Sequence, residues 1–320
     1  MSAALLWWTL HDVKFADVWA NVRAARPWPV VLGVGLATLP FFLRVFRWRL
    51  LLRREDGSAL PPGPLWHAIA IGFMANNTLP LRMGELIRAL AVHRLAGVRL
   101  TAALASLAVE RLMDVLIVVF LLGIGLLMAG LPAQTTIAGV HLASLTVSLA
   151  VVALSGLGVA ALVVAFPAAT ESAVRRLVPW PGLAERLAGL VEGLAQGMSA
   201  LQSPARIAGV IAWSLAIWLC NAASFSAMFS AFGIPVDYAG ALVLQGAIMF
   251  VIAVPSSPGY FGAFEVPVVA VLALFLVPKG TAVSYALTYH LTTFVPITLF
   301  GLWSVARTGF GLREVRAAAA

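Results

Sequence analysis

Four long stretches of this sequence contain no charged residue. Lys, Arg, Asp and Glu are all missing from residues 115–170, 207–236, 238–264 and 280–306. Over the whole chain of 320 residues only 11% are charged and 62% are apolar, whereas soluble domains carry about 25% charged residues. A helix needs roughly 20 apolar residues to cross a bilayer. The sequence therefore predicts an all-α, polytopic membrane protein.

The apolar stretches predict about six to eight transmembrane helices in one domain, residues 27–320. We expect full or partial spans near residues 29–52, 65–79, 84–95, 102–131, 141–166, 207–232, 238–254 and 282–307. Residues 1–26 contain three tryptophans and three basic residues but no run long enough to span. Such a segment suits the headgroup boundary, so we expect an interfacial amphipathic element there.

The basic residues predict orientation and partners. The formal net charge is +8, and the arginines gather at the ends of apolar runs instead of forming a separate basic domain. This distribution favours anionic lipid headgroups over nucleic acid. The arginines between Arg44 and Arg54 predict a cytoplasmic end for the first span by the positive-inside rule. We expect a multi-pass protein of the cell inner membrane with a cytoplasmic C-terminus.

The first of two interrupted segments follows residues 65–79. Fifteen helical residues rise only about 22 Å, which is short of the roughly 30 Å hydrocarbon core. Pro80 and Gly84 then break the chain before a second short helix. The pair is predicted to form a re-entrant hairpin, whose irregular backbone must line protein or a water-filled cavity.

Polar residues gather around this first break, and two interpretations remain open. The free amides at the start of a helix near Pro80 would attract an anionic group, and two arginines would add bidentate contacts to a phosphate. The residues predicted to bind substrate here are Asn76, Asn77, Arg82, Glu85 and Arg88. The alternative is a charge network at the membrane boundary, in which the two asparagines cap helices.

A pair of carboxylates follows in the next span. Glu110 and Asp114 lie one turn apart on the same helical face, and Arg111 flanks them. Unpaired carboxylates in hydrocarbon are costly, so a partner among Arg82, Arg88 and Arg111 is expected, or else one carboxylate is protonated. Ion pairs that lock the helices together and a role in proton or ion coupling both remain open. Arg111 is also predicted to contact substrate.

The second interrupted segment is PSSPGYFGAFE, residues 255–265. Its hinge residues are predicted to be Pro255, Pro258, Gly259 and Gly262. Glu265 follows directly, and His290 in the last span either pairs with its carboxylate or hydrogen-bonds a backbone carbonyl. We predict that Gly259 and Glu265 contribute to substrate binding, and that Glu265 and His290 contribute to proton or ion coupling.

The two broken segments superpose at an offset of 180 residues. This offset pairs Glu85 with Glu265 and Thr101 with Thr281. Broken helices at corresponding positions of inverted halves mark transporter binding sites. The sequence therefore suggests inverted half-repeats over residues 65–131 and 245–307.

Several motifs together resemble the lysylphosphatidylglycerol synthase transmembrane, or flippase-like, family. They are RWR at 47–49, NNTLPLRMGELIRA at 76–89, ERLMD at 110–114 and PSSPGYFGAFE at 255–265. The resemblance implies a flippase that moves a phospholipid, an aminoacyl-phospholipid or a polyprenyl-phosphate-linked lipid between leaflets. About a dozen residues follow the last expected span, so we expect a stand-alone member without the aminoacyl-transferase domain.

Two further functions stay open beside transport. A membrane enzyme acting on a lipid-linked phosphate would use Glu110 and Asp114 to bind Mg²⁺ or as a general base. An accessory subunit would recruit a glycosyltransferase or synthase. The sequence contains no nucleophile elbow, phosphate loop or zinc motif, so we expect no catalytic residue, metal or cofactor. The expected partners are anionic membrane lipids, another copy of the chain or a separately encoded lipid-modifying enzyme.

Overall fold

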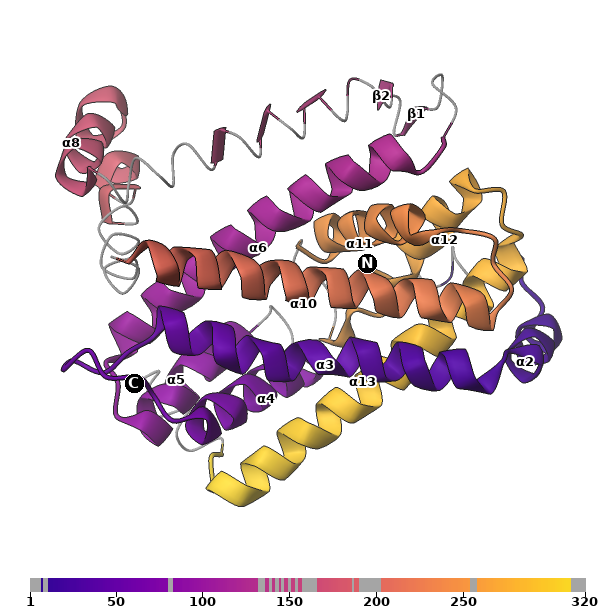
Figure 1. Ribbon diagram of the computed structural model, residues 1–320, viewed down its shortest axis with the longest axis horizontal. Coiled ribbons are helices and arrows are strands. Elements are labelled where there is room, and N and C mark those ends of the chain that lie inside the picture. Colours follow the sequence, from indigo (N-terminus) through magenta and orange to yellow (C-terminus); the bar gives the residue numbers. More distant parts are fainter. Residues whose placement is uncertain are drawn as a thin grey trace.

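A computed structural model describes residues 7, 11–79, 83–131, 136–137, 140–141, 144, 147–148, 151–152, 155–156, 166–185, 187–189, 203–253 and 258–311. Between its loops this part of the chain is helical apart from an isolated bridge between Arg53 and Ala59 and one antiparallel pair of two-residue strands, β1 (Thr136–Ile137) and β2 (Val140–His141). The predicted all-α fold is confirmed for the described residues (Figure 1).

The helices fall into two groups along the chain. The first contains α2 (Phe15–Ala24), α3 (Pro27–Leu51), α4 (Pro62–Thr78), α5 (Gly84–Ala96) and α6 (Leu100–Met128). The second contains α8 (Pro167–Leu177), α10 (Pro204–Ala231), α11 (Tyr238–Ala253), the 3₁₀ turn η2 (Pro258–Tyr260), α12 (Glu265–Leu274) and α13 (Lys279–Thr308). These bounds agree with most of the expected spans. The span expected at 141–166 lies largely outside the described residues.

Proline and glycine explain several of these helix ends. The first turns of α3, α4 and α10 each contain a proline, whose missing N–H has no partner to lose at that position. Gly97 and Gly309 follow α5 and α13 with φ values of 69° and 63°. This left-handed conformation ends a helix and suits glycine.

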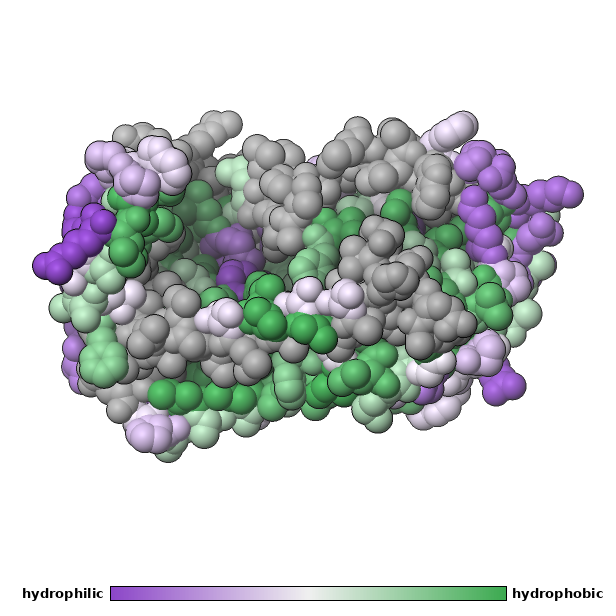
Figure 2. Space-filling view, turned by 90° about the horizontal axis from the view of Figure 1, so that it is seen from above, coloured by the Kyte–Doolittle hydropathy of each residue, from purple (hydrophilic) through white to green (hydrophobic). Residues whose placement is uncertain are grey.

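Three described helices are both long enough and apolar enough to cross a membrane, namely α3, α6 and α10. Helix α13 has 30 residues but is less apolar, because Ser, Thr, Tyr and His side chains are spread along it. In Figure 2, hydrophilic residues gather at the two ends of the long axis, and most of the coloured residues between them are hydrophobic. The chain is a helical, multi-pass membrane protein.

An antiparallel pair, α3 and α10, runs along the long axis of the molecule (Figure 1). At one end the N–H of Arg26, just before α3, donates to the carbonyl of Ala231 at the end of α10, at 2.9 Å. Helix α4 packs on α3, α5 and α13, while α11 packs on α10, α12 and α6. The two short helices of each group therefore lie against each other, and α4 and α11 each also lie against a long helix of the other group.

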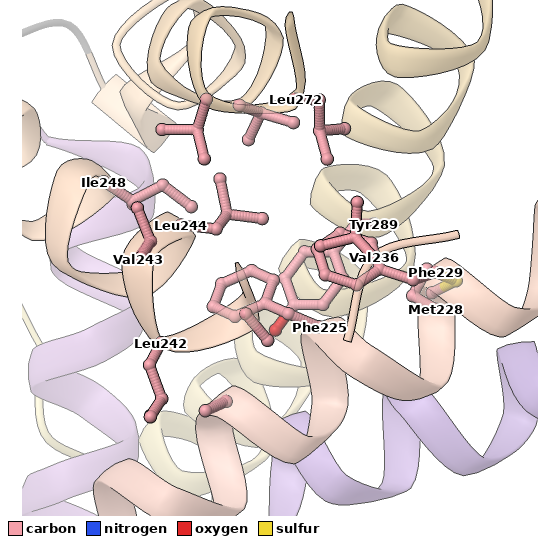
Figure 3. Close-up of a cluster of buried hydrophobic side chains, with 14 of the residues drawn as sticks. Phe225, Met228, Phe229, Val236, Leu242, Val243, Leu244, Ile248, Leu272 and Tyr289 are labelled. Carbon is pink, nitrogen blue, oxygen red and sulfur yellow. The ribbon is translucent and has the colours of Figure 1, made fainter. Parts of the chain in front are cut away.

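Two apolar clusters fill the interior. Figure 3 shows the larger cluster, in which α10, α11, α12 and α13 bury residues such as Phe225, Phe229, Leu272 and Tyr289. The second cluster joins α3 to α4, α5 and α6 around Trp48, which is fully buried. The charged groups described below lie on the helices that surround this second cluster.

Gly84 allows α4 and α5 to approach closely. A Cβ atom at Gly84 would overlap the carbonyl oxygen of Gly72 and the Oδ1 atom of Asn76. We expect Gly84→Ala to destabilise the protein by about 1–3 kcal/mol, because overpacking forces the backbone apart. Gly123→Ala is the matched control, because a Cβ there meets no atom within 4 Å. Thermal unfolding in detergent should show a lower midpoint for Gly84→Ala only, and equal midpoints would contradict this packing.

Candidate functional site

Seven charged side chains of the described residues meet between α3, α5 and α6, and we call them the arginine–carboxylate cluster. Its members are Arg44, Arg47, Glu85, Arg88, Glu110, Arg111 and Asp114. Five of the seven are buried, while the side chains of Arg111 and Glu85 are 30% and 31% exposed. Four guanidinium groups therefore face three carboxylates, which leaves one positive charge in excess.

Asp114 is held by α3 and α10. Arg47 donates from Nη1 to Asp114 Oδ1 at 2.5 Å and from Nη2 to Oδ2 at 3.4 Å. From α10, Trp218 Nε1 donates to the same Oδ1 at 2.9 Å, and Ser214 Oγ accepts from Arg47 Nη1 at 3.0 Å. On α6 itself, Arg111 Nη2 lies 3.0 Å from Asp114 Oδ2. The carboxylate thus ties three helices together.

Glu110 shares Arg47 and Arg111 with Asp114 and adds Arg88 as a third cation. Arg88 of α5 makes a bidentate pair with it, at 2.7 Å to Oε1 and 3.0 Å to Oε2. Arg111 Nη2 lies 2.6 Å and Arg47 Nη2 lies 3.2 Å from Oε1. The Arg88 guanidinium also stacks 3.9 Å above the Trp48 ring. Because both Nη atoms of Arg88 contact Glu110, a headgroup would have to displace that carboxylate to bind them.

Arg44 is the cation with the weakest pairing. Its Nη1 atom is buried and has no hydrogen bond to any described residue, and it lies 3.6 Å from Asp114 Oδ2 and 3.9 Å from Glu110 Oε1. The rings of Phe73 and Trp218 approach the guanidinium at 5.2 Å and 5.7 Å. Arg44 therefore retains hydrogen-bonding capacity that the described residues do not use.

The asparagines near the first break have structural contacts. Asn76 Oδ1 accepts the N–H of Gly84 at 2.9 Å, so it caps the start of α5. Asn77 Nδ2 donates to Thr298 Oγ1 of α13 at 3.0 Å. Glu85 faces Arg111 at 3.7 Å. Pro80 and Arg82 lie outside the described residues, so the helix start expected near Pro80 is described only from Gly84 onward.

A second polar site lies at the other break. His290 Nδ1 lies 2.6 Å from Glu265 Oε1, which confirms the predicted pairing. The other ring nitrogen, Nε2, lies 2.8 Å from the carbonyl oxygen of Gly259. Glu265 Oε2 accepts the N–H of Gly262 at 2.6 Å. We call these groups the Glu265–His290 pair.

The turn beside this pair requires its glycines. Gly259 and Gly262 have φ values of 69° and 84°, which most other residues adopt only at a cost. Helix α11 ends at Ala253 and α12 begins at Glu265, with Pro258 in η2 between them, so the predicted interruption is present. Pro255 lies outside the described residues.

Comparison with known proteins decides the family. The sequence profile described as the lysylphosphatidylglycerol synthase TM region matches residues 1–301. The chain belongs to this family. It is 30% identical over 315 residues to a protein named Glycosyltransferase AglD from Haloferax volcanii, with 90% of this chain and 50% of that protein covered. The chain thus spans about half the length of that relative.

A second relative is nearer to this chain in size. A protein named UPF0104 membrane protein, from Methanothermobacter thermautotrophicus, is 26% identical over 264 residues. The alignment covers 77% of this chain and 75% of that protein.

In this member of the lysylphosphatidylglycerol synthase TM region family, sequence reasoning overlooked two cluster residues. The sequence places Arg44 and Arg47 at a basic cytoplasmic end, and Arg47 also in the RWR motif, yet both are buried, at 8% and 0% exposed. Their position gave a signal, because they stand one turn apart and before the end of an apolar helix. Nothing in the sequence marked Ser214 or Trp218 as their neighbours.

Proposed function

We propose that this chain is a lipid flippase, which moves a lipid with an anionic, phosphate-containing headgroup between the leaflets of the cell inner membrane. The excess positive charge of the arginine–carboxylate cluster carries the proposal. An uncompensated charge inside a membrane protein is costly, and a phosphate oxygen would both balance it and accept a charge-assisted hydrogen bond. Arg44 and the partly exposed Arg111 are the proposed phosphate ligands.

The order of the helices supports a transporter architecture. Helices α3, α4, α5 and α6 have 25, 17, 13 and 29 residues, and α10, α11, α12 and α13 have 28, 16, 10 and 30. These lengths pair α3 with α10, α4 with α11, α5 with α12 and α6 with α13. In agreement with this pairing, α4 packs on α13 and α11 packs on α6. We therefore propose two inverted repeats that begin at α3 and α10, earlier than the sequence suggested.

In this architecture α4 with α5 and α11 with α12 are re-entrant pairs. Seventeen residues of α4 rise about 26 Å and thirteen of α5 about 20 Å, which is less than the hydrocarbon core of roughly 30 Å. Each pair has a polar site at its break: the arginine–carboxylate cluster beside the first and the Glu265–His290 pair at the second. Transporters built from inverted repeats bind substrates and coupling ions at such breaks.

The proposed orientation follows the basic residues. Arg49, Arg53 and Arg54 at the end of α3 would face the cytoplasm, together with the arginines of α8. Helix α2 would then lie at the opposite interface. Its exposed aromatic residues Phe15 and Trp19, at 79% and 50%, suit a headgroup boundary.

One observation favours a second candidate function. The relative named Glycosyltransferase AglD is about twice as long as this chain, so a domain like this one belongs to a protein named as a sugar-transferring enzyme. This chain would then present a lipid-linked phosphate to a glycosyltransferase. Direct metal-dependent catalysis is less favoured, because guanidinium groups occupy the oxygens of Glu110 and Asp114 that would bind Mg²⁺.

Reconstitution tests the transport proposal. Purified protein in liposomes should move labelled phosphatidylglycerol, its lysyl ester or a polyprenyl phosphate across the bilayer faster than empty liposomes do. Labelled glucosyl diacylglycerol, which has a polar headgroup but no phosphate, is the matched control lipid and should stay near the background rate. The proposal is wrong if none of the phosphate lipids moves faster than in empty liposomes.

A further inference from the structure

The imidazole of His290 lies between two hydrogen-bond acceptors. Its Nε2 atom faces the carbonyl oxygen of Gly259 at 2.8 Å, and its Nδ1 atom faces Glu265 Oε1 at 2.6 Å. A carbonyl oxygen cannot donate, so Nε2 must carry the proton of that bond. A neutral imidazole has only one N–H. The short contact at Nδ1 therefore requires one more proton, located either on Nδ1 or on the carboxyl group.

The pair is shielded from other charges. Glu265 is fully buried and His290 is 7% exposed, and the rings of Phe261 and Phe264 lie 4.7 Å and 4.8 Å from the imidazole. Among the described residues, Glu265 is the one charged side chain that pairs with His290. The proton shared by these two groups therefore decides which hydrogen bonds form here.

Other titratable groups stand on the elements packed around α12 and α13, and three of them bond to other residues. Tyr289 bonds Ser224, Tyr285 donates to Phe225 O and Cys220 donates to Leu36 O. The remaining ones are Asp17 and Arg23 on α2, the arginines of α3, His67 on α4, Arg206 on α10, Tyr238 on α11 and Tyr260 in η2. Of these, the groups on α2, α3, α4 and α11 have no hydrogen bond or ion pair with the Glu265–His290 pair in the part of the chain that the structure describes.

We propose that Glu265 and His290 form a proton-binding site that holds one shared proton and fastens the turn at residues 258–264. With the proton bound, all three hydrogen bonds of the pair exist together, including those to Gly259 O and Gly262 N. When the proton leaves to water, two lone pairs oppose each other, either at Nδ1 and Oε1 or at Nε2 and Gly259 O. One bond is then lost, so the turn is fastened at lower pH and loosened at higher pH.

Four residues are predicted to couple transport to protons or ions: Glu110, Asp114, Glu265 and His290. Of these, the Glu265–His290 pair is suited to releasing and taking up a proton. Glu110 and Asp114 are paired with guanidinium groups, which stay charged at every physiological pH, so those pairs offer no exchangeable proton. His290 stands 180 residues after Glu110, the offset that also relates Glu265 to Glu85. The two proposed repeats would thus have an ion-paired carboxylate and a proton-binding imidazole at equivalent positions. The use of the proton to drive lipid movement rests on the proposed function, whereas the site itself does not.

Hydrogen exchange in lipid nanodiscs tests the site without any transported lipid. After correction for the intrinsic pH dependence of exchange, the amides of residues 259–265 in the unmodified protein should exchange at least tenfold faster at about pH 8.5 than at about pH 5.5. Glu265→Gln imitates the proton-bound state, because its amide group can donate to Nδ1 while its oxygen accepts from Gly262. This variant should stay protected at both pH values.

Two further variants complete the test. His290→Asn lacks the group that reaches Gly259 O and should exchange rapidly at both pH values, opposite to Glu265→Gln. Asp237→Asn is the matched control, because Asp237 Oδ1 accepts the N–H of Gly240 at 2.9 Å near the start of α11 with no imidazole opposite. It should leave the pH response of residues 259–265 unchanged.

The outcomes separate the proton site from the proposed function. A pH-independent exchange rate in the unmodified protein overturns the site, as does a pH response that survives in both Glu265→Gln and His290→Asn. If Glu265→Gln does not fold, the unmodified protein and His290→Asn still decide. A normal pH response in a protein that moves no lipid overturns the flippase proposal and leaves the proton site standing. Lipid transport without any pH response in hydrogen exchange overturns the proton site and leaves the flippase proposal standing.

Discussion

Replacing Arg47 by methionine is expected to lower the free energy of unfolding by about 3–5 kcal/mol, the usual cost of leaving one member of a buried ion pair alone. Arg47 is fully buried and holds Asp114 at 2.5 Å and Glu110 at 3.2 Å. Methionine fills a similar volume but donates no hydrogen bond. The variant would remove a charge from α3 at the contact that joins this helix to α6 and α10.

The matched control for Arg47→Met is an exposed ion pair of similar length. Arg99 and Glu55 lie 2.7 Å apart with both side chains 71% exposed. Arg99→Met should change stability by less than about 1 kcal/mol, because water screens and solvates such a pair. Thermal or denaturant unfolding in one detergent, followed by tryptophan fluorescence, measures both variants. If both variants lost the same free energy of unfolding, burial of the Arg47 ion pairs would not explain their contribution to stability.

A double variant isolates the pair from the helix packing around it. Asp114→Asn alone should also destabilise, because it leaves Arg47 with a weaker partner. In Arg47→Met combined with Asp114→Asn the loss should be smaller than the sum of the two single losses, since the second change removes the group that the first left unpaired. Strictly additive losses would contradict the coupling that the 2.5 Å contact implies.

Local sequence patterns predicted the elements of this fold well because membrane insertion depends mainly on apolar runs. The absence of charge in residues 207–236 predicted α10, and the two glycines and Pro258 predicted the interruption before α12. The interior was harder to predict. Asp114 pairs with Arg47, which lies 67 residues earlier, and that contact depends on how α3 packs on α6.

The partner of Glu265 could be predicted because residues 282–307 contain a single histidine and no Lys or Arg before Arg307. His290 was the natural candidate for a buried acid, and the structure places its ring nitrogen 2.6 Å away. For Glu110 the sequence offered several arginines as partners, so it could not predict which of them would form the ion pair. Arg88 was predicted as a ligand for phosphate, but it meets Glu110 through both Nη atoms. An arginine in a broken segment can thus serve helix packing as well as substrate binding.

Arg44 differs from Arg47 because its removal balances the cluster. Four guanidinium groups face three carboxylates, and without Arg44 three cations would face three anions. Arg44 Nη1 makes no hydrogen bond with the described residues, so its loss breaks no strong contact. We therefore expect Arg44→Met to fold with an unfolding midpoint equal to or above that of the unmodified protein, in contrast to Arg47→Met.

The same change should nevertheless impair transport of phosphate lipids. A hydrogen bond to a charged group contributes about 1.5–3 kcal/mol, so losing one phosphate contact corresponds to roughly a 10- to 100-fold lower rate for phosphatidylglycerol or polyprenyl phosphate in liposomes. Arg44→Lys, which keeps the charge but not the planar donors, should retain an intermediate rate. A stable Arg44→Met protein that transports phosphate lipids at the full rate would rule out Arg44 as their ligand. The excess charge would then need another explanation, because burial of an unbalanced guanidinium in a membrane protein has no structural benefit of its own.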